Sequence, residues 1–170
     1  MTLSPNSFLT CHLTVSKSAP RSCIVGSVRD NHAGVFHVTT RSNAEEHIFR
    51  DDDDYRTGVR ILAKLVRQGF FSCHGFCLMP THYHLLASFP ENGLRPAVQR
   101  LNRRYASFFN ERYDRHGHVF GARYRALPIV NTEHGDRIPV YIAENPPVRP
   151  WRWSSYDASF PFVAPLPWCR

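Results

Sequence analysis

The sequence predicts an α+β fold of the ferredoxin-like, split βαβ type, with a central antiparallel sheet and an added C-terminal helix. Two observations predict it. The 170 residues are 42% hydrophobic and 13% aromatic, which suits one domain with one core. Segments with the periodicity of strands and of helices follow one another in the order strand, helix, strand, strand, helix, strand.

The first strand and the first helix are expected over residues 35–66. Residues 35–40 are mainly β-branched or aromatic, which favours a strand. The acidic run 51–54 can complement the amino end of a helix, and apolar residues at helical spacing follow it up to Val66. Gly69 is expected to end this helix.

The remaining elements are read in the same way. Two adjacent strands are expected over residues 70–78 and 82–89, on either side of a proline turn. Apolar residues recur every three or four positions over 93–113, which predicts an amphipathic helix. Residues 119–130 are expected to be mostly extended, and a short helix should follow from about 138 to 145.

The charge of the chain points to nucleic acid. Lys and Arg total 21 against 14 acids, the net charge is +7, and 19 of the cations are arginines, whose forked donors suit phosphate. Residues 1–90 carry a net charge of +2 and the remaining residues a net charge of +5, so the basic excess lies mainly in the second half.

We therefore predict DNA contacts in the second half from five arginines interleaved with tyrosines that can stack on bases. These are Arg103, Arg104, Arg112, Arg123 and Arg125. The alternative for the tyrosines, above all Tyr105, is that they pack in the core.

Membrane insertion and secretion are not expected. No run approaches the roughly 18 apolar residues that a membrane span needs, and the first thirty residues lack the apolar stretch of a signal peptide. Five cysteines without such a signal are expected to be reduced, and the chain to be cytoplasmic.

A zinc site is one alternative for the cysteine-rich strand. Cys73, Cys77, His82 and His84 are all residue types that bind zinc. In an extended strand, however, positions 73 and 77 lie about 13 Å apart, too far to share one ion without a tight loop.

His82-Tyr83-His84 is the sharpest local pattern. Side chains at i and i+2 of a strand leave the same face, so both imidazoles can bind one divalent ion. Two histidines alone do not make a metal site, since a third ligand is needed, and the alternative is a pair of ordinary histidines.

Tyr141 and Asn145, spaced i and i+4, share one face of a helix and could supply a nucleophile and that ligand. A core tyrosine and a helix-ending asparagine would give the same spacing.

Eight blocks of the sequence together resemble the single-tyrosine HUH transposases (insertion sequence 200-like), in particular their REP-associated branch. The resemblance covers about residues 33–157 and leaves a loose extension over 1–32 and a tail over 158–170. The blocks are His37 to Asn43, Ile48 to Asp51, Cys77 to Leu86, Leu101 to Ala106, Gly117 to Phe120, Arg123 to Arg125, Tyr141 to Pro146 and Trp153 to Tyr156.

The resemblance implies a DNA strand transferase that acts on single-stranded, hairpin-containing ends, as a monomer or homodimer. It implies that His82, His84 and the amide of Asn145 hold Mg²⁺ or Mn²⁺, and that Tyr141 forms a covalent 5′-phosphotyrosine. A phosphotyrosine conserves the energy of the cleaved bond for rejoining, so no nucleotide cofactor is expected. No G-x-x-x-x-G-K-[ST] loop is found in the sequence.

Three departures from the family pattern favour an alternative, a decayed copy that binds DNA hairpins without cutting them. Thr81 replaces the usual asparagine before the histidines, and Pro147 follows Asn145-Pro146 where the family usually has valine. Pro139 stands in a segment that the family builds as a longer helix. Because proline fits only the first turn of a helix, Tyr141 is expected near the amino end of a shortened one.

Overall fold

The computed structural model describes residues 32–121, 123–130 and 132–168, and their elements follow the predicted order with one 3-10 turn added. They are β1 (Gly34–Arg41), η1 (Asn43–Glu45), α1 (Asp52–Arg67), β2 (Ser72–Met79), β3 (His82–Phe89), α2 (Leu94–Arg112), β4 (Arg125–Pro128) and α3 (Thr132–Glu144). The predicted extension over 1–32 lies outside this part of the chain except for His32. Within the described residues, no helix combines the length and apolar character that crossing a membrane requires.

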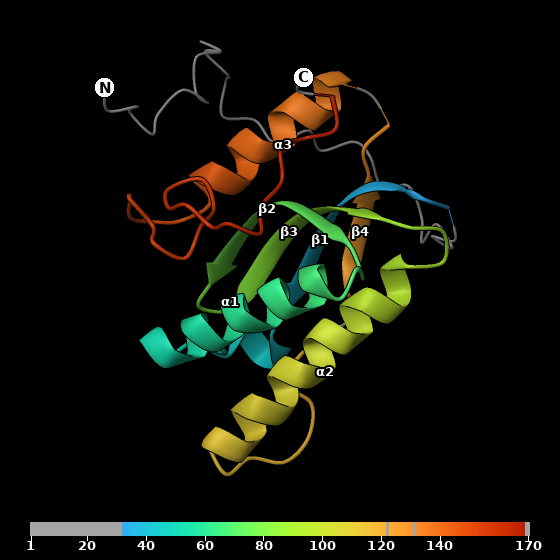
Figure 1. The fold of residues 1–170 in the computed structure, drawn as a ribbon. Coiled ribbons are helices and arrows are strands. Elements are labelled where there is room, and N and C mark those ends of the chain that lie inside the picture. Colours follow the sequence, from blue (N-terminus) through green and yellow to red (C-terminus); the bar gives the residue numbers. More distant parts are fainter. Residues whose placement is uncertain (1–31, 122, 131, 169–170) are drawn as a thin grey trace.

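The four strands form one antiparallel sheet in the order β2-β3-β1-β4. The helices α1 and α2 lie over one face of this sheet, and α3 lies over the other (Figure 1). The predicted ferredoxin-like α+β fold with an added C-terminal helix is therefore confirmed. Of the stretch expected to be extended over 119–130, only the four residues of β4 form a strand.

The two faces of β3 differ in chemistry because successive side chains of a strand point to opposite sides. Tyr83 and Leu85 belong to the main core under α1 and α2. Leu86 belongs to a smaller core that it shares with Ile138 and Ile142 of α3. Residues 82 and 84, which alternate with Tyr83, therefore lie on the α3 face.

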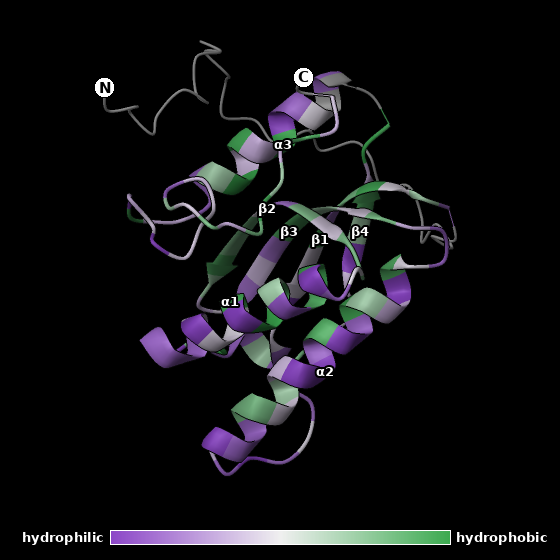
Figure 2. Ribbon diagram, viewed as in Figure 1, coloured by the Kyte–Doolittle hydropathy of each residue, from purple (hydrophilic) through white to green (hydrophobic). Residues whose placement is uncertain are grey.

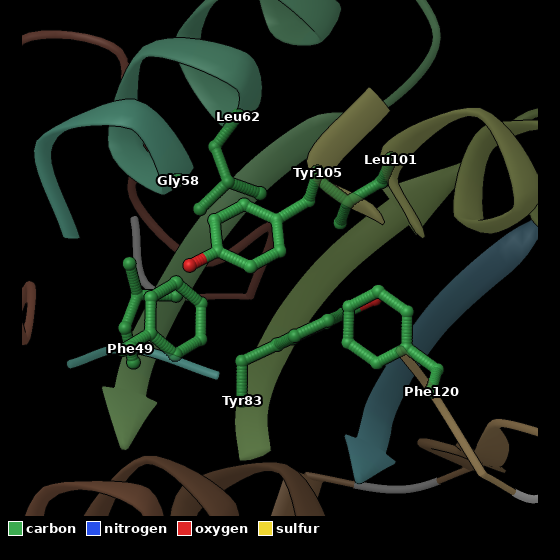
Figure 3. A pocket seen from close by; sticks show the side chains of 8 residues that line it. Phe49, Gly58, Leu62, Tyr83, Leu101, Tyr105 and Phe120 are labelled. Atoms are coloured by element: carbon green, nitrogen blue, oxygen red, sulfur yellow. The ribbon is translucent and has the colours of Figure 1, made fainter. Parts of the chain in front are cut away.

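The main core is tightly packed around Tyr83 and Tyr105 (Figure 3). A cavity of about 10 Å³ between these rings and Phe120 has room for about one water molecule. Gly58 lets α1 lie close to the sheet, because a Cβ there would be only 3.0 Å from the side chain of Leu78 in β2. This cavity is too small for a substrate.

The acidic run fixes α1 to α2. Asp51 caps α1 by accepting hydrogen bonds from two backbone N–H groups of its first turn. Both ends of this helix are hydrophilic (Figure 2). Asp54 is fully buried and accepts hydrogen bonds from Arg112, the Tyr113 hydroxyl and the Arg50 N–H, each at 2.8 Å. Arg112 also lies 2.7 Å from Asp51. Much of its donor capacity is thus engaged within the fold.

The helix α3 differs from the prediction. It begins at Thr132 rather than near Ile138, so Tyr141 lies in its last turn and not near its amino end. Pro139 is inside the helix and has no N–H to donate to the carbonyl group four residues earlier, that of Gly135. Gly135 has no side chain, and a Cβ there would collide with the ring of Trp168. The indole of Trp168 packs in its place, so the C-terminal segment supports the helix before the proline.

The chain after α3 returns to the outer edge of β2. Backbone N–H groups of Ser155 and Ala164 donate to Phe76 and Cys73 at 3.0 and 2.8 Å, and Leu78 donates to Trp153 at 3.0 Å. These bonds cover the edge of the strand, which would otherwise offer free backbone groups to another chain. Three residues of the segment predicted to be a tail, Phe160, Phe162 and Val163, pack against the main core.

The zinc alternative is wrong. Cys73 and Cys77 are free and buried, but Cys73 belongs to the main core and Cys77 to the smaller core on the other face. A bulge between Cys73 and Gly75 changes the alternation of side chains between them. Among the described residues, no group of three or more His, Cys, Asp or Glu side chains could hold a metal ion.

Candidate active site on the α3 face of the sheet

His82 and His84 lie side by side on β3, with ring centroids 5.1 Å apart. The Nδ1 atom of His82 is 3.0 Å from the Thr81 hydroxyl, and Nδ1 of His84 is 2.9 Å from Nε2 of His37. The Nε2 atoms of both His82 and His84 are buried and have no hydrogen-bond partner. A buried nitrogen without a partner is uncommon, and a lone pair at this atom is a usual ligand for a divalent metal. The pair therefore has the form of an unsatisfied two-histidine site.

Both imidazoles are neutral at pH 7. Burial lowers the pKa of His82 to about 4, and the charge of Arg41 contributes in the same direction. Burial lowers the pKa of His84 to about 2, with smaller contributions from His37, His82 and Arg41. Because a protonated imidazole has no free lone pair, these shifts keep the two Nε2 atoms available as ligands.

These depressed pKa values predict a pH dependence of stability. Below the ordinary histidine pKa of about 6.5, the unfolded chain takes up protons that His82 and His84 in the folded protein do not. The free energy of unfolding should therefore fall as the pH drops from 6.5 to 5, by up to about 1.4 kcal/mol per pH unit for each histidine. Urea unfolding of the metal-free protein across this range measures the slope. His84→Gln should flatten the slope, and an identical slope in that variant would contradict the assignment.

Tyr141, on α3, has its phenol ring next to the histidines of the sheet. Its ring is perpendicular to that of His84, with centroids 5.8 Å apart, and lies 6.0 Å from that of His37. It is 43% exposed, in contrast to Tyr83 and Tyr105, which are 3% and 2% exposed. Tyr83 donates to Asn102, and Tyr105 donates to the Ile48 carbonyl, both within the fold. Of these three tyrosines, Tyr141 is the one a substrate can reach.

Asn145 directly follows α3. Its side-chain nitrogen donates to the Tyr141 carbonyl at 2.7 Å, so the amide oxygen is the atom that a cation would take. No hydrogen bond in the described part of the chain joins Asn145 to His82 or His84, and its role as third ligand stays a prediction. Two imidazoles and one amide would leave open positions on a bound cation for phosphate oxygens, and Mg²⁺ or Mn²⁺ as that cation stays a prediction.

The arginines predicted to contact DNA lie on different sides of the sheet. Arg125 pairs with Thr39, which pairs with His84, and residues directly opposite one another across strands share a face. The exposed Arg125 therefore lies on the histidine side. Arg123, also exposed, lies two residues before the start of β4. The other three predicted arginines belong to α2 on the opposite face: Arg103, Arg104 and Arg112.

A family model for IS200-like transposases matches residues 31–145, a range that holds every element from β1 to α3. The chain belongs to the IS200-like transposase family. Among solved structures, a REP-associated tyrosine transposase bound to a REP hairpin superposes on this transposase with a TM-score of 0.59 at 16% identity. The match covers 78% of this chain and 92% of that one, and it shows the same fold. The predicted resemblance is confirmed.

A putative transposase from Deinococcus radiodurans R1 is also similar, with a TM-score of 0.47 and 18% identity over 65% of this chain and 89% of that one. The comparison with curated proteins gave no match.

Sequence reasoning did not identify three site residues of this transposase, all on β1. His37 contacts both His84 and Tyr141, the Thr39 hydroxyl lies 3.2 Å from Nδ1 of His84, and Arg41 pairs with His82 across the strands. Their i, i+2, i+4 spacing in a predicted strand was a usable signal, because it places all three on one face. It does not reveal which face, or that β1 lies next to β3.

Proposed function

We propose that this transposase cuts and rejoins single-stranded DNA at hairpin-forming repeats, through a covalent bond between Tyr141 and a 5′ phosphate. The observation that carries the proposal is the contact of Tyr141, from α3, with His84 beside the two unpartnered Nε2 atoms. The substrate class is supported by the likeness to a transposase solved with a REP hairpin. Excess positive charge suits a phosphate-rich partner.

His82 and His84 would hold Mg²⁺ or Mn²⁺ through Nε2, with the amide oxygen of Asn145 as the third protein ligand. When bound, the cation offsets charge on the scissile phosphate and on the oxygen that leaves it. The burial that keeps both imidazoles neutral makes their lone pairs available at neutral pH.

The covalent step conserves the phosphodiester bond. The Tyr141 oxygen, losing its proton, attacks phosphorus and forms the Tyr–O–P bond while the bond from phosphorus to the 3′ oxygen breaks. The 3′ oxygen takes up a proton and leaves as a hydroxyl group. Rejoining is the reverse reaction with a 3′ hydroxyl, so no external energy source is needed.

A second candidate function is hairpin binding without cleavage, and Pro139 inside α3, two residues before Tyr141, favours it. The experiment that separates the two functions is incubation of the whole chain with a labelled hairpin oligonucleotide, with Mn²⁺ or with a chelator. Cleavage in Mn²⁺ only, with a protein–DNA adduct that resists denaturant, supports the transposase. Tight binding with no cleavage in either condition supports the binding protein.

Either function predicts salt-dependent binding to which Arg125 contributes. Hairpin affinity should fall steeply with rising salt, and Arg125→Ala should reduce the slope of log K against log salt by about 0.7 to 1. Arg60→Ala, which removes an exposed arginine of α1 that is not among the five predicted DNA contacts, is the matched control and should leave the slope unchanged. Fluorescence anisotropy at several salt concentrations measures both. Equal binding of duplex and hairpin, or affinity independent of salt, would contradict the prediction.

A further inference from the structure

His37 is a buried histidine that the proposed reaction does not use directly. It is 8% exposed and lies on β1, two residues before Thr39, the position that pairs with His84. The planes of its ring and of the His84 ring differ by 23°, with centroids 5.2 Å apart. The Nε2 atom of His37 is 2.9 Å from Nδ1 of His84, the length of a good hydrogen bond.

The proton in this hydrogen bond decides what His84 can do. A neutral imidazole carries one N–H, on either Nδ1 or Nε2. If His37 donates to His84, the proton of His84 must be on Nε2, where it has no acceptor and blocks the lone pair. If His84 donates from Nδ1 to His37, its Nε2 lone pair is open. The second arrangement avoids a buried N–H without an acceptor, which is rarer in proteins than an acceptor with unused capacity.

Resting on the proposed function, we infer that His37 is a positioning residue, which accepts the Nδ1–H of His84 and holds the Nε2 lone pair of His84 toward the cation and Tyr141. A ligating histidine usually has such a partner on its other nitrogen. The Thr39 hydroxyl, 3.2 Å from the same Nδ1 atom, is the more distant second acceptor.

His37 also links the two halves of the site. Its ring centroid lies 6.0 Å from that of Tyr141, with the two ring planes at 72°, while its Nε2 atom meets Nδ1 of His84. A single side chain on β1 therefore orients a group from β3 and contacts one from α3. Loss of the hydrogen bond should disturb cation binding even where the volume of the ring is retained.

The test compares His37→Leu with His37→Gln in the whole chain. Gln places an acceptor oxygen near the position of Nε2, whereas Leu fills similar space without one. His37→Leu should weaken Mn²⁺ binding by about 10- to 100-fold, while His37→Gln should stay within a few-fold of the unmutated protein. Electron paramagnetic resonance of free Mn²⁺ measures the affinity without any DNA cleavage. Thermal unfolding of both variants shows that they are folded.

A second measurement needs no substitution. Long-range ¹H–¹⁵N spectra of the unmutated, metal-free protein distinguish the two neutral forms of His84, and the proton should be on Nδ1. A proton on Nε2 of His84, or an Mn²⁺ affinity unchanged in His37→Leu, would overturn this inference and leave the proposed function standing. If the unmutated protein does not bind Mn²⁺, the metal site in the proposed function fails and this inference fails with it.

Discussion

His82→Ala is expected to abolish metal-dependent cleavage of a hairpin oligonucleotide while the fold survives. The substitution removes one of the two unpartnered Nε2 atoms and leaves a single imidazole, which is too few donors to hold a weakly bound divalent cation. Stabilisation of the phosphate charge by such a cation amounts to several kcal/mol, so the cleavage rate should fall by about 10³-fold or more. Single-turnover cleavage at saturating protein measures this loss apart from binding.

His116→Ala is the matched control for this experiment. His116 is exposed and lies in the loop after α2, outside the sheet, so the same chemical change there should leave cleavage unaltered. Hairpin affinity in the presence of a chelator should be the same for both variants, because the proposed phosphate contacts come from arginines. Full cleavage activity in His82→Ala would remove the metal hypothesis.

Much of the fold was predictable from local periodicity. β1, β3 and α2 agree with the predicted ranges to within a residue or two, because alternation and helical spacing are local properties. The start of α3 was not predictable in the same way. Pro139 argues locally for a late start, whereas the contact of Gly135 with Trp168, 33 positions later, stabilises the helix before it. A tertiary contact of this kind leaves no signal in the helix itself.

The site was predictable in part for the same reason. The i and i+2 spacing of His82 and His84 fixes their common face once β3 is known. That His37 meets His84, however, depends on the register of two strands whose paired residues are 41 to 55 positions apart in sequence. Register depends on the whole core, so a single sequence indicates that His37 and Thr39 share a strand face but not which residues that face meets.

Arg112 shows that charge alone does not identify a partner, and its contact with DNA stays a prediction. Its spacing and charge are those of a phosphate contact, yet Asp54, fully buried, and Asp51 both bind its guanidinium. Removal of Arg112 would leave a buried carboxylate short of a donor. A loss of DNA binding in an Arg112 variant would therefore report on folding as well as on contact.

Tyr141→Phe is expected to eliminate the covalent protein–DNA adduct while hairpin binding and stability remain unchanged. The change removes one oxygen and little volume, and the ring can keep its edge contact with His84. Without that oxygen no Tyr–O–P bond can form, so the adduct should fall below detection rather than decrease by a small factor. The adduct is seen as a labelled band of reduced mobility on a denaturing gel, after incubation with Mn²⁺ and a 5′-extended hairpin.

Tyr156→Phe is the matched control, because the buried hydroxyl of Tyr156 has no hydrogen-bond partner and its removal breaks no bond within the described residues. This variant should form the adduct at the level of the unmutated protein. An adduct that persists in Tyr141→Phe would identify another tyrosine as the nucleophile. The next tyrosine to substitute would then be Tyr124, which packs partly against the main core and follows Arg123. If the unmutated protein binds the hairpin tightly but forms no adduct, the contact between Tyr141 and His84 is a remnant, and the binding function favoured by Pro139 is the better account.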